Sequence, residues 1–279
     1  MSNHRLSIFI LSVALLLISF TSIFAQGQRV MVKIERADYL RHDDKIGKNT
    51  QSLNGNVMLS HHKTVLYCDS AYMYNDSNVV VAYGNIHVIQ NDSIHLYGNK
   101  LTYFGDKQLA KIRENVRANK GETWLYTEFL DFDQVDSKAY FYDGGKVVNG
   151  LNTLTSKRGI YYPNSNDVYF KDDVVGISRQ ASMYSDTMLF NTNTEITTIL
   201  GPTTIINNDS SIINSEKGWY DTKADVAKLM LNNKITTKNY ILTGETILYE
   251  KYRGVGKVWN NMVLTDTIEG ENAPVSTRW

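Results

Sequence analysis

One motif recurs seven times along the chain, at intervals of 29 or 30 residues, and it constrains the fold more than any other feature. Each copy is eight residues long and runs from a large aliphatic residue to a large, mostly aromatic one. A repeat of this length is one supersecondary unit that buries its apolar face only by stacking on its neighbours. The periodicity therefore predicts a stack of similar units around a shared core.

Aligning the seven copies gives columns of uniform chemical character. The first column is aliphatic: Leu66, Leu96, Leu125, Leu154, Met183, Ile213 and Leu242. Two positions later all residues are small: Cys68, Gly98, Thr127, Ser156, Ser185, Ser215 and Gly244. A polar column follows: Asp69, Asn99, Glu128, Lys157, Asp186, Glu216 and Glu245. A second apolar or small column is Ala71, Leu101, Leu130, Gly159, Met188, Gly218 and Ile247, and the closing column is Met73, Tyr103, Phe132, Tyr161, Phe190, Tyr220 and Tyr249.

The spacing of these columns predicts strands that bend in the middle. Residues two apart in a strand share a face, so the aliphatic and small columns point the same way. The next inward column lies three positions after the small one. A strand keeps one face inward across such a step only if it bends or bulges there. Each repeat is therefore expected to turn a corner at the polar column.

A second strand in each repeat carries the pattern Gly-Asn-Val or a relative of it. The copies lie at residues 55–57, 84–86, 114–116, 145–147, 172–174 and 233–235. Residues 201–205 form the least regular copy, and Pro202 predicts a bulge or strand break there. Capped apolar stripes with a period of 3.6 residues are missing from the sequence, which predicts very little helix. The predicted fold is all-β: an elongated stack of bent strand pairs, open at both ends, with a fainter copy at 37–40 as an irregular end cap.

The N-terminus has the features of a secretory signal peptide. Arg5 supplies positive charge, residues 6–20 are apolar, and Ala25 is a small residue at a plausible cleavage point. The alternative is a membrane anchor, although the apolar run is short for a span. We expect residues 1–25 to be a cleavable signal, residues 26–264 to be the repeat domain, and residues 265–279 to be a flexible tail. Cys68 is the single cysteine, so no internal disulfide is expected despite export.

Charge and motif content argue against several function classes. Lys plus Arg equals Asp plus Glu, 29 against 29, which gives no electrostatic reason to expect a nucleic-acid partner. His61 and His62 are sequence neighbours that point apart in a strand, and we expect them in a solvated loop, with Asp43-Asp44, rather than at a metal. His87 and His95 lack a cysteine or carboxylate partner. We expect no metal, no cofactor and no catalytic residues, because phosphate-cradling, zinc-binding and Ser-His-Asp patterns are missing.

The tandem pattern Gly-Asn-Val-x-Leu, then Leu-x-Cys-Asp-x-Ala-x-Met, resembles the OstA-like (LptA-type) family of lipopolysaccharide-transport proteins. Asn56, Asn85 and Asn115 match its first strand, and Asp69 and Asp186 match its second. The resemblance covers roughly residues 34–263. The chain departs from the family pattern at Lys157, Gly98, Gly244 and Pro202, and irregular strand geometry is expected near these positions.

The resemblance implies a β-jellyroll folded like a taco, open along one side. It also implies a non-enzymatic periplasmic bridge that carries lipopolysaccharide toward the outer membrane, with lipid A acyl chains in the apolar interior. The expected lipid-binding residues are the aliphatic column, the closing column, and Ala71, Leu101, Leu130, Met188 and Ile247. Asp69, Asn99, Glu128, Asp186, Glu216 and Glu245 would be structural corner residues. Expected partners are other transport components with similar jellyroll domains, joined through terminal edge strands, and a second copy of the chain joined head to tail.

Two alternative functions remain open at this stage. A structural or adhesive repeat protein of the envelope would show the same columns, because a closed core also needs aliphatic and aromatic residues. A carbohydrate-active β-helix enzyme would need carboxylates that converge on one face. The acidic column is periodic rather than clustered, which disfavours the enzyme.

Overall fold

The computed structural model describes residues 30–42, 46–221, 223–250, 253 and 255–267. The chain divides into a unit of residues 1–30 and a unit of residues 31–279, and the second unit contains every described strand. The predicted signal peptide and residues 268–279 of the predicted tail lie outside the described residues, as do Asp43 and Asp44. The described part of the chain contains no helix long and apolar enough to cross a membrane.

The second unit is built from 23 β-strands, and the described residues include only one short 3-10 helix, Asn75–Ser77. The first strands are β1 (Lys33–Arg36), β2 (Tyr39–His42), β3 (Thr50–His61), β4 (Thr64–Tyr74), β5 (Val79–Gln90), β6 (Ile94–Phe104), β7 (Leu109–Lys120), β8 (Thr123–Asp133) and β9 (Lys138–Asn149). Then follow β10 (Asn152–Ser156), β11 (Arg158–Tyr162), β12 (Asp167–Ile177), β13 (Ala181–Asn191), β14 (Ile196–Ile199), β15 (Thr203–Asn207), β16 (Ile212–Ser215) and β17 (Lys217–Asp221). The last are β18 (Val226–Leu231), β19 (Asn233–Thr236), β20 (Tyr240–Gly244), β21 (Thr246–Glu250), β22 (Val255–Trp259) and β23 (Val263–Asp266).

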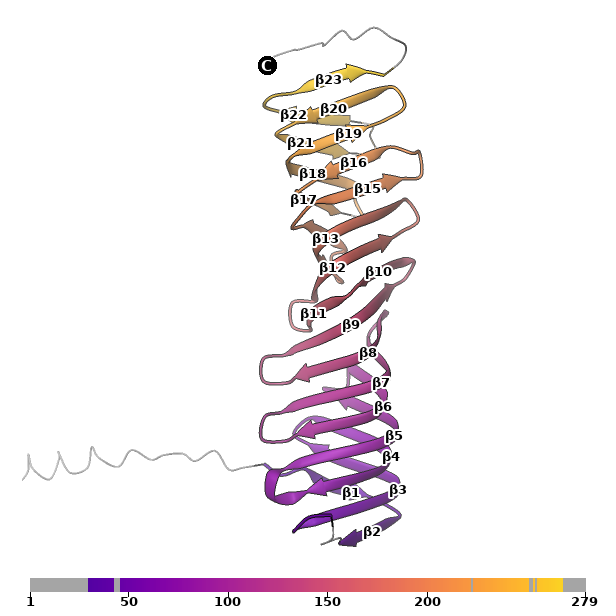
Figure 1. Cartoon of the computed structure of the whole chain (residues 1–279), viewed down its shortest axis with the longest axis vertical. Helices are drawn as coiled ribbons and strands as arrows, with labels where there is room; N and C mark the ends of the chain where they lie inside the picture. The colour runs from indigo at the N-terminus through magenta and orange to yellow at the C-terminus, as the bar shows by residue number, and fades with distance from the viewer. Residues whose placement is uncertain (1–29, 43–45, 222, 251–252, 254, 268–279) are drawn as a thin grey trace, which may run out of the picture. The chain divides into compact units, whose positions relative to one another are not determined.

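All strand pairs are antiparallel, and the strands stack one above another along the long axis of the second unit (Figure 1). From β3 to β9, each long strand pairs along its whole length with the next one. From β13 onward each rung is two separate strands, so the pairing follows two ladders: β13-β14-β17-β18-β21-β22 and β13-β15-β16-β19-β20-β23. The all-β fold of stacked, bent strand pairs is therefore confirmed.

The Gly-Asn pairs make the corners by adopting the left-handed backbone conformation. Gly55 and Asn56 have φ of 78° and 47°, and Gly84 and Asn85 have φ of 73° and 45°. In each case the pairing register shifts, so that these two residues face one polar-column residue on the neighbouring strand, for example Asp69 opposite residues 55–56. Glycine and asparagine tolerate positive φ better than other residues. The extra residue thus lies on the Gly-Asn strand, and the polar column faces it.

Later copies of the Gly-Asn motif lie elsewhere than the sequence pattern suggested. In β9 the left-handed pair is Asp143-Gly144, and Gly145 pairs with Thr127, so the assignment of the motif to residues 145–147 is wrong by two positions. Asn233 pairs with Gly244 and follows the left-handed Asn232, which shifts the copy at 233–235 in the same way. The residues with positive φ at these two corners are Asp143, Gly144 and Asn232, and aspartate, glycine and asparagine all tolerate positive φ.

The predicted irregularity at Pro202 is confirmed as a strand break. β14 ends at Ile199 and β15 begins at Thr203, and the two strands belong to different ladders. Equivalent breaks lie at Lys157, Glu216 and Glu245, each of which is a polar-column residue. A proline has no N–H to donate to a ladder, so it is tolerated where the ladder is already interrupted.

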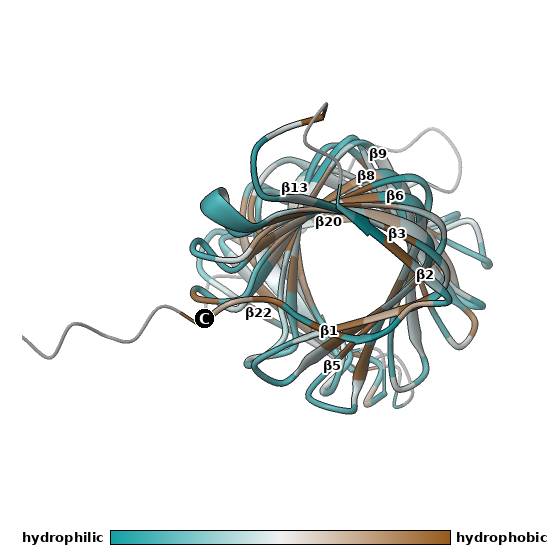
Figure 2. Cartoon of the chain, turned by 90° about the horizontal axis from the view of Figure 1, so that it is seen from below, coloured by the Kyte–Doolittle hydropathy of each residue, from teal (hydrophilic) through white to brown (hydrophobic). Residues whose placement is uncertain are grey.

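The core is one continuous cluster of buried apolar side chains that extends from Val32 to Ile247. Seen along the stack, the strands surround this cluster and the loops that join them project outward (Figure 2). In the middle of the stack Phe141, 2 % exposed, fills a space next to two glycines. A Cβ atom on Gly159 would lie 2.1 Å from the Phe141 ring, and one on Gly145 would lie 2.3 Å from it. These two glycines therefore make room for the ring.

Candidate functional site: the apolar interior and its seam

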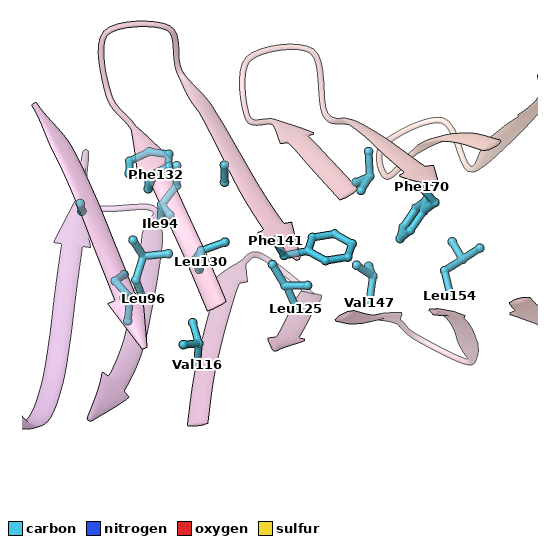
Figure 3. Close-up of a cluster of buried hydrophobic side chains, with 14 of the residues drawn as sticks. Ile94, Leu96, Val116, Leu125, Leu130, Phe132, Phe141, Val147, Leu154 and Phe170 are labelled. Carbon is cyan, nitrogen blue, oxygen red and sulfur yellow. The ribbon is translucent and has the colours of Figure 1, made fainter. Parts of the chain in front are cut away.

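The aliphatic column lies inside the stack, as Figure 3 shows for Leu96, Leu125 and Leu154. Six of its seven members are buried: Leu66, Leu96, Leu125, Leu154, Met183 and Ile213. Leu242, the last member, is partly buried and packs against the same cluster. Alternation along each strand puts these residues on one face, and the neighbouring strands place them in a row.

The second apolar column and the closing column complete the interior. Ala71, Leu101, Leu130, Met188 and Ile247 are all at most 1 % exposed. Met73, Tyr103, Phe132 and Phe190 are buried, while Tyr161, Tyr220 and Tyr249 are partly buried. Burial raises the pKa of Tyr161 to about 12, which keeps this phenol neutral. Eighteen of the nineteen residues that the sequence singled out for the interior are buried in the core cluster or pack against it, and Tyr249 is partly buried.

The corner residues face away from the interior. Asp69, Asn99, Glu128, Asp186 and Glu245 are exposed, and Glu216 is half-buried. Several bond to the left-handed pair of a neighbouring strand. Asp69 accepts a hydrogen bond from Asn85 Nδ2 at 2.9 Å, Glu128 accepts one from the Asn115 N–H at 3.0 Å, and Glu245 accepts one from Asn261 Nδ2 at 2.6 Å. These bonds are local and tie one corner to the next.

Lys157 is the one basic residue in the polar column, and the two residues opposite it on the neighbouring strand are acidic. The pair of residues opposite this position is Asp172-Asp173, and Lys157 Nζ lies 2.6 Å from Asp173 Oδ2. The hydrogen bond that Lys157 donates to the Asp173 carboxylate raises the pKa of Lys157, and the negative charge of Asp173 raises it further. Arg158 forms a second ion pair with Asp172. At this corner the polar-column residue is positive and the left-handed pair opposite it is negative, and Asp172 and Asp173 keep the positive φ of the other corners.

The strand ends form two rows of loops, which we call the first and second lips. The first lip contains the turns that follow β3, β5, β7, β9, β12, β15 and β19, and the second lip contains the turns that follow β4, β6, β8, β11, β13 and β17. Each bent strand runs from one lip to the other, so the two lips flank one side of the interior. We call the line where they meet the seam.

Hydrogen bonds close the seam at four places. Each joins residues 42–46 positions apart in the chain. Three of them start from the last residue of a strand beside the first lip: His61 Nδ1 lies 2.7 Å from Tyr103 Oη, Lys120 Nζ donates to the Pro163 carbonyl at 2.6 Å and to Asn166 Oδ1 at 2.9 Å, and Asn149 Nδ2 donates to the Thr192 carbonyl at 3.3 Å. In the fourth, the N–H of Val32, just before β1, donates to Asn78 Oδ1 at 3.1 Å. The similar offsets show a latch that follows the repeat of the fold.

His61 belongs to this latch, so the expectation that it lies in a solvated loop is wrong. His61 is 5 % exposed, whereas its neighbour His62 is exposed and has φ of 52° at the turn. The Tyr103 hydroxyl also donates to Gln134 Oε1 at 3.3 Å, and Gln134 Nε2 donates to Thr64 Oγ1 at 3.1 Å. The chain of bonds crosses the seam twice and satisfies polar groups above an apolar core.

Sequence reasoning missed the other latch residues as well. Asn78, Lys120, Gln134 and Asn149 are polar residues next to turns, where such residues are ordinary. The one available signal is that each lies at the end of a strand or next to one. This signal is weak, because nothing in the sequence states which turn of the opposite lip lies across the seam.

Space inside the stack is limited to small cavities along the interior. One of about 40 Å³ lies between Leu96, Leu125, Phe132 and Phe141, under Lys120. Others of about 30 Å³ and 50 Å³ lie under His61 and Thr64, and next to Leu154 and Phe190. A water molecule's share of liquid volume is ~30 Å³. These cavities are small, so an acyl chain gains room in the interior when the two lips separate.

Both ends of the stack present edge strands. Among the described residues, β1 and β2 pair only with β3, β22 pairs only with β21, and β23 pairs only with β20. Large apolar side chains are exposed on these strands, including Tyr39 (75 %) at one end and Trp259 (45 %) at the other. Unpaired N–H and C=O groups on edge strands are able to accept a further strand.

Chemistry outside the interior is sparse. His87 Nε2 lies 3.1 Å from His95 Nδ1, so these two histidines are each other's partner on the outer face. Burial, followed by the neighbouring His95, lowers the pKa of His87. The described residues contain no group of three or more His, Cys, Asp or Glu side chains arranged to hold a metal ion. Cys68 is buried, and burial raises the pKa of its thiol to about 12.

Comparison with known proteins gives one family and one similar solved structure to report. Residues 29–180 match the family described as OstA-like protein. The solved structure is that of LptH from Pseudomonas aeruginosa, described as the LptA homologous periplasmic component of the conserved lipopolysaccharide transport device. It is 18 % identical, with a TM-score of 0.24, and the similarity covers 48 % of this chain and 79 % of LptH. The search of curated proteins returned no match.

The family match extends over 152 of the 279 residues, which is more than half of the chain. It includes the Gly-Asn corners of the first repeats and the interior columns from Leu66 to Leu154. The chain therefore belongs to the OstA-like protein family.

Proposed function

We propose that this protein is a non-enzymatic, periplasmic lipid-binding bridge that carries lipopolysaccharide toward the outer membrane. The observation that carries the proposal is the continuous apolar interior, which crosses every repeat and is bordered on one side by a seam held by hydrogen bonds. Family membership and the resemblance of the repeat to lipopolysaccharide-transport proteins support the choice of ligand.

The energetics of the seam favour a ligand with long apolar chains. A hydrogen bond between protein groups contributes about 0.5–1.5 kcal/mol net. Burial of one methylene contributes ~0.8 kcal/mol. About two buried methylenes therefore offset the loss of one latch contact. An acyl chain of a dozen carbons has enough apolar surface to separate the lips, whereas a small polar solute does not.

The two ends of the stack support the bridging part of the proposal. Edge strands β1, β2, β22 and β23 offer main-chain groups and exposed apolar side chains to a similar jellyroll domain or to a second copy of the chain. Such end-to-end joining would extend the apolar interior from one domain into the next. Export by a cleavable signal at residues 1–25 would place the protein in the periplasm.

Photocrosslinking from inside and outside the stack tests the lipid site. A photoreactive residue at Leu125 or Phe132, both buried, is expected to label lipopolysaccharide in cells. The matched control is Thr102, which lies between two inward residues and points outward on β6. Mass spectrometry of lipid retained by protein purified from its own envelope identifies the ligand. Labelling at neither inward position would contradict the proposal.

A structural or adhesive role in the envelope is the second candidate. The observation in its favour is the tight interior, whose cavities measure only about 30–50 Å³. The same measurements separate the two functions: a structural protein retains no lipid and gives no inward crosslink, yet keeps its fold.

A further inference from the structure

Lys120 is the one latch residue described above that carries a permanent positive charge. It ends β7 on the first lip and reaches across the seam to the second lip. Its Nζ donates to the Pro163 carbonyl at 2.6 Å and to Asn166 Oδ1 at 2.9 Å. An ammonium group has three N–H donors. The described residues thus supply two acceptors, and both of them are neutral.

Four described lysines form ion pairs with carboxylates: Lys111, Lys138, Lys157 and Lys223. Among the described residues, no ion pair includes Lys120. Its ammonium has three donors and only neutral acceptors, so its charge is left for an anion to use. The geometry therefore leaves a role for an anion from outside the chain.

The position of Lys120 shows what kind of anion would fit. Lys120 helps to line the cavity of about 40 Å³, together with Ile94, Leu96, Leu125 and Phe132, and Figure 3 labels these four apolar residues. A cation at the mouth of an apolar space matches an amphiphile that has an anionic group next to its acyl chains. A free anion would gain the charge contact alone and would leave the apolar space empty.

We propose that Lys120 binds the phosphate headgroup of an acylated amphiphile whose chains enter the interior beneath it. The phosphate oxygens take the place of the Pro163 carbonyl and Asn166 Oδ1 as acceptors, which releases the latch at this point of the seam. The bonds of Lys120 to its two neutral acceptors already have a charged donor, and a phosphate adds a charged acceptor and so a direct attraction between opposite charges. The exchange therefore favours opening when the ligand is anionic. This inference rests on the proposed lipid-binding function and adds a headgroup preference to it.

Binding measurements on three variants test the proposal. Lys120→Met removes the charge and keeps a flexible stem, Lys120→Arg keeps the charge, and Lys146→Met removes an exposed lysine from the outer face of β9 as the matched control. The ligands are lipid A with both phosphates, the same lipid after enzymatic removal of its phosphates, and inorganic phosphate. Urea unfolding of each variant shows that the fold is kept.

Lys120→Met is expected to weaken binding of phosphorylated lipid A by roughly five- to tenfold, since the charge pair with the phosphate is lost, while the loss of the Lys120 latch bonds, which the ligand would have to break, offsets part of the effect. Its affinity for the dephosphorylated lipid should be unchanged or higher. Lys120→Arg should restore phosphate preference, Lys146→Met should behave as wild type, and inorganic phosphate should not bind measurably. Equal loss for both lipids would overturn the inference and leave lipid binding intact. Failure of wild type to bind either lipid would instead refute the proposed function.

Discussion

A covalent tether between the two lips should prevent an acyl chain from loading. Asn149 Nδ2 lies 3.3 Å from the Thr192 carbonyl across the seam, so cysteines at these two positions are within reach of a short, cleavable bismaleimide. Cys68 is the single native cysteine and is replaced by alanine in the same chain. The tether replaces a weak latch contact with a bond that a ligand cannot displace.

The expected size of the effect follows from the interior. The nearest cavity, next to Leu154 and Phe190, has a volume of about 50 Å³, so it offers a chain little room before the lips separate. A chain of twelve carbons contributes roughly 10 kcal/mol when it is fully buried, against about 0.5–1.5 kcal/mol for one hydrogen bond. The native latch therefore yields to the chain, whereas the tether holds the lips together and opposes its entry.

Displacement of a fluorescent dodecanoyl probe measures this effect. The tethered protein is expected to bind the probe at least tenfold more weakly, and cleavage of the linker should restore binding. A matched control uses cysteines at Ser165 and Asn191, where an asparagine also bonds to a main-chain carbonyl, at 3.0 Å, but within the second lip. Tethering that pair should leave binding unchanged. Undiminished binding by the seam-tethered protein would show that chains do not enter by separation of the lips.

Three further predictions concern packing, pH and thiol reactivity. Gly159→Ala should lower the free energy of unfolding by about 1–3 kcal/mol in urea titrations, because its methyl overlaps the Phe141 ring. Phe141→Leu in the same chain should recover part of that loss, and a wild-type midpoint for Gly159→Ala would contradict the packing argument. Burial and a neighbouring histidine lower the pKa of His87 below its ordinary 6.5, so the folded state favours the neutral ring. Stability should be fully present above pH 6.5 and fall as the pH drops toward the folded-state pKa; an equally steep fall for His87→Gln would rule this out. The Cys68 thiol, with a pKa of about 12 from burial, should react with Ellman's reagent at pH 8 only on unfolding, and rapid reaction of the native protein would disprove it.

The interior columns could be assigned from the sequence because strand alternation is a local rule. Leu66, Cys68, Ala71 and Met73 have spacings of two, three and two, and this pattern specifies both which residues face inward and where the strand bends. Repetition supplied seven independent instances of the same pattern, so single irregular residues did not obscure it. The break at Pro202 was predictable for the same reason, because proline acts on its own ladder bond.

Assignments that depended on one short motif were less secure. The copies at 145–147 and 233–235 were misplaced because the requirement at a corner is a pair of left-handed residues, and aspartate meets it as well as glycine or asparagine. A search for Gly-Asn-Val finds the commonest solution and misses Asp143-Gly144. The partner strand reveals the true position through its register.

The sequence by itself determined the repeat, the bent strands and the list of inward residues, since all of these follow from spacing along one strand. Only the tertiary structure decided what closes the seam. Its latch contacts join residues 42–46 positions apart, and their partners are set by how far the strand stack twists between one lip and the other. A histidine near a turn, such as His61, therefore looks solvated in the sequence and proves buried in the fold. The physical reason is that a polar group at a strand end forms its hydrogen bonds with whichever loop of the opposite lip the packing of the strands places across the seam.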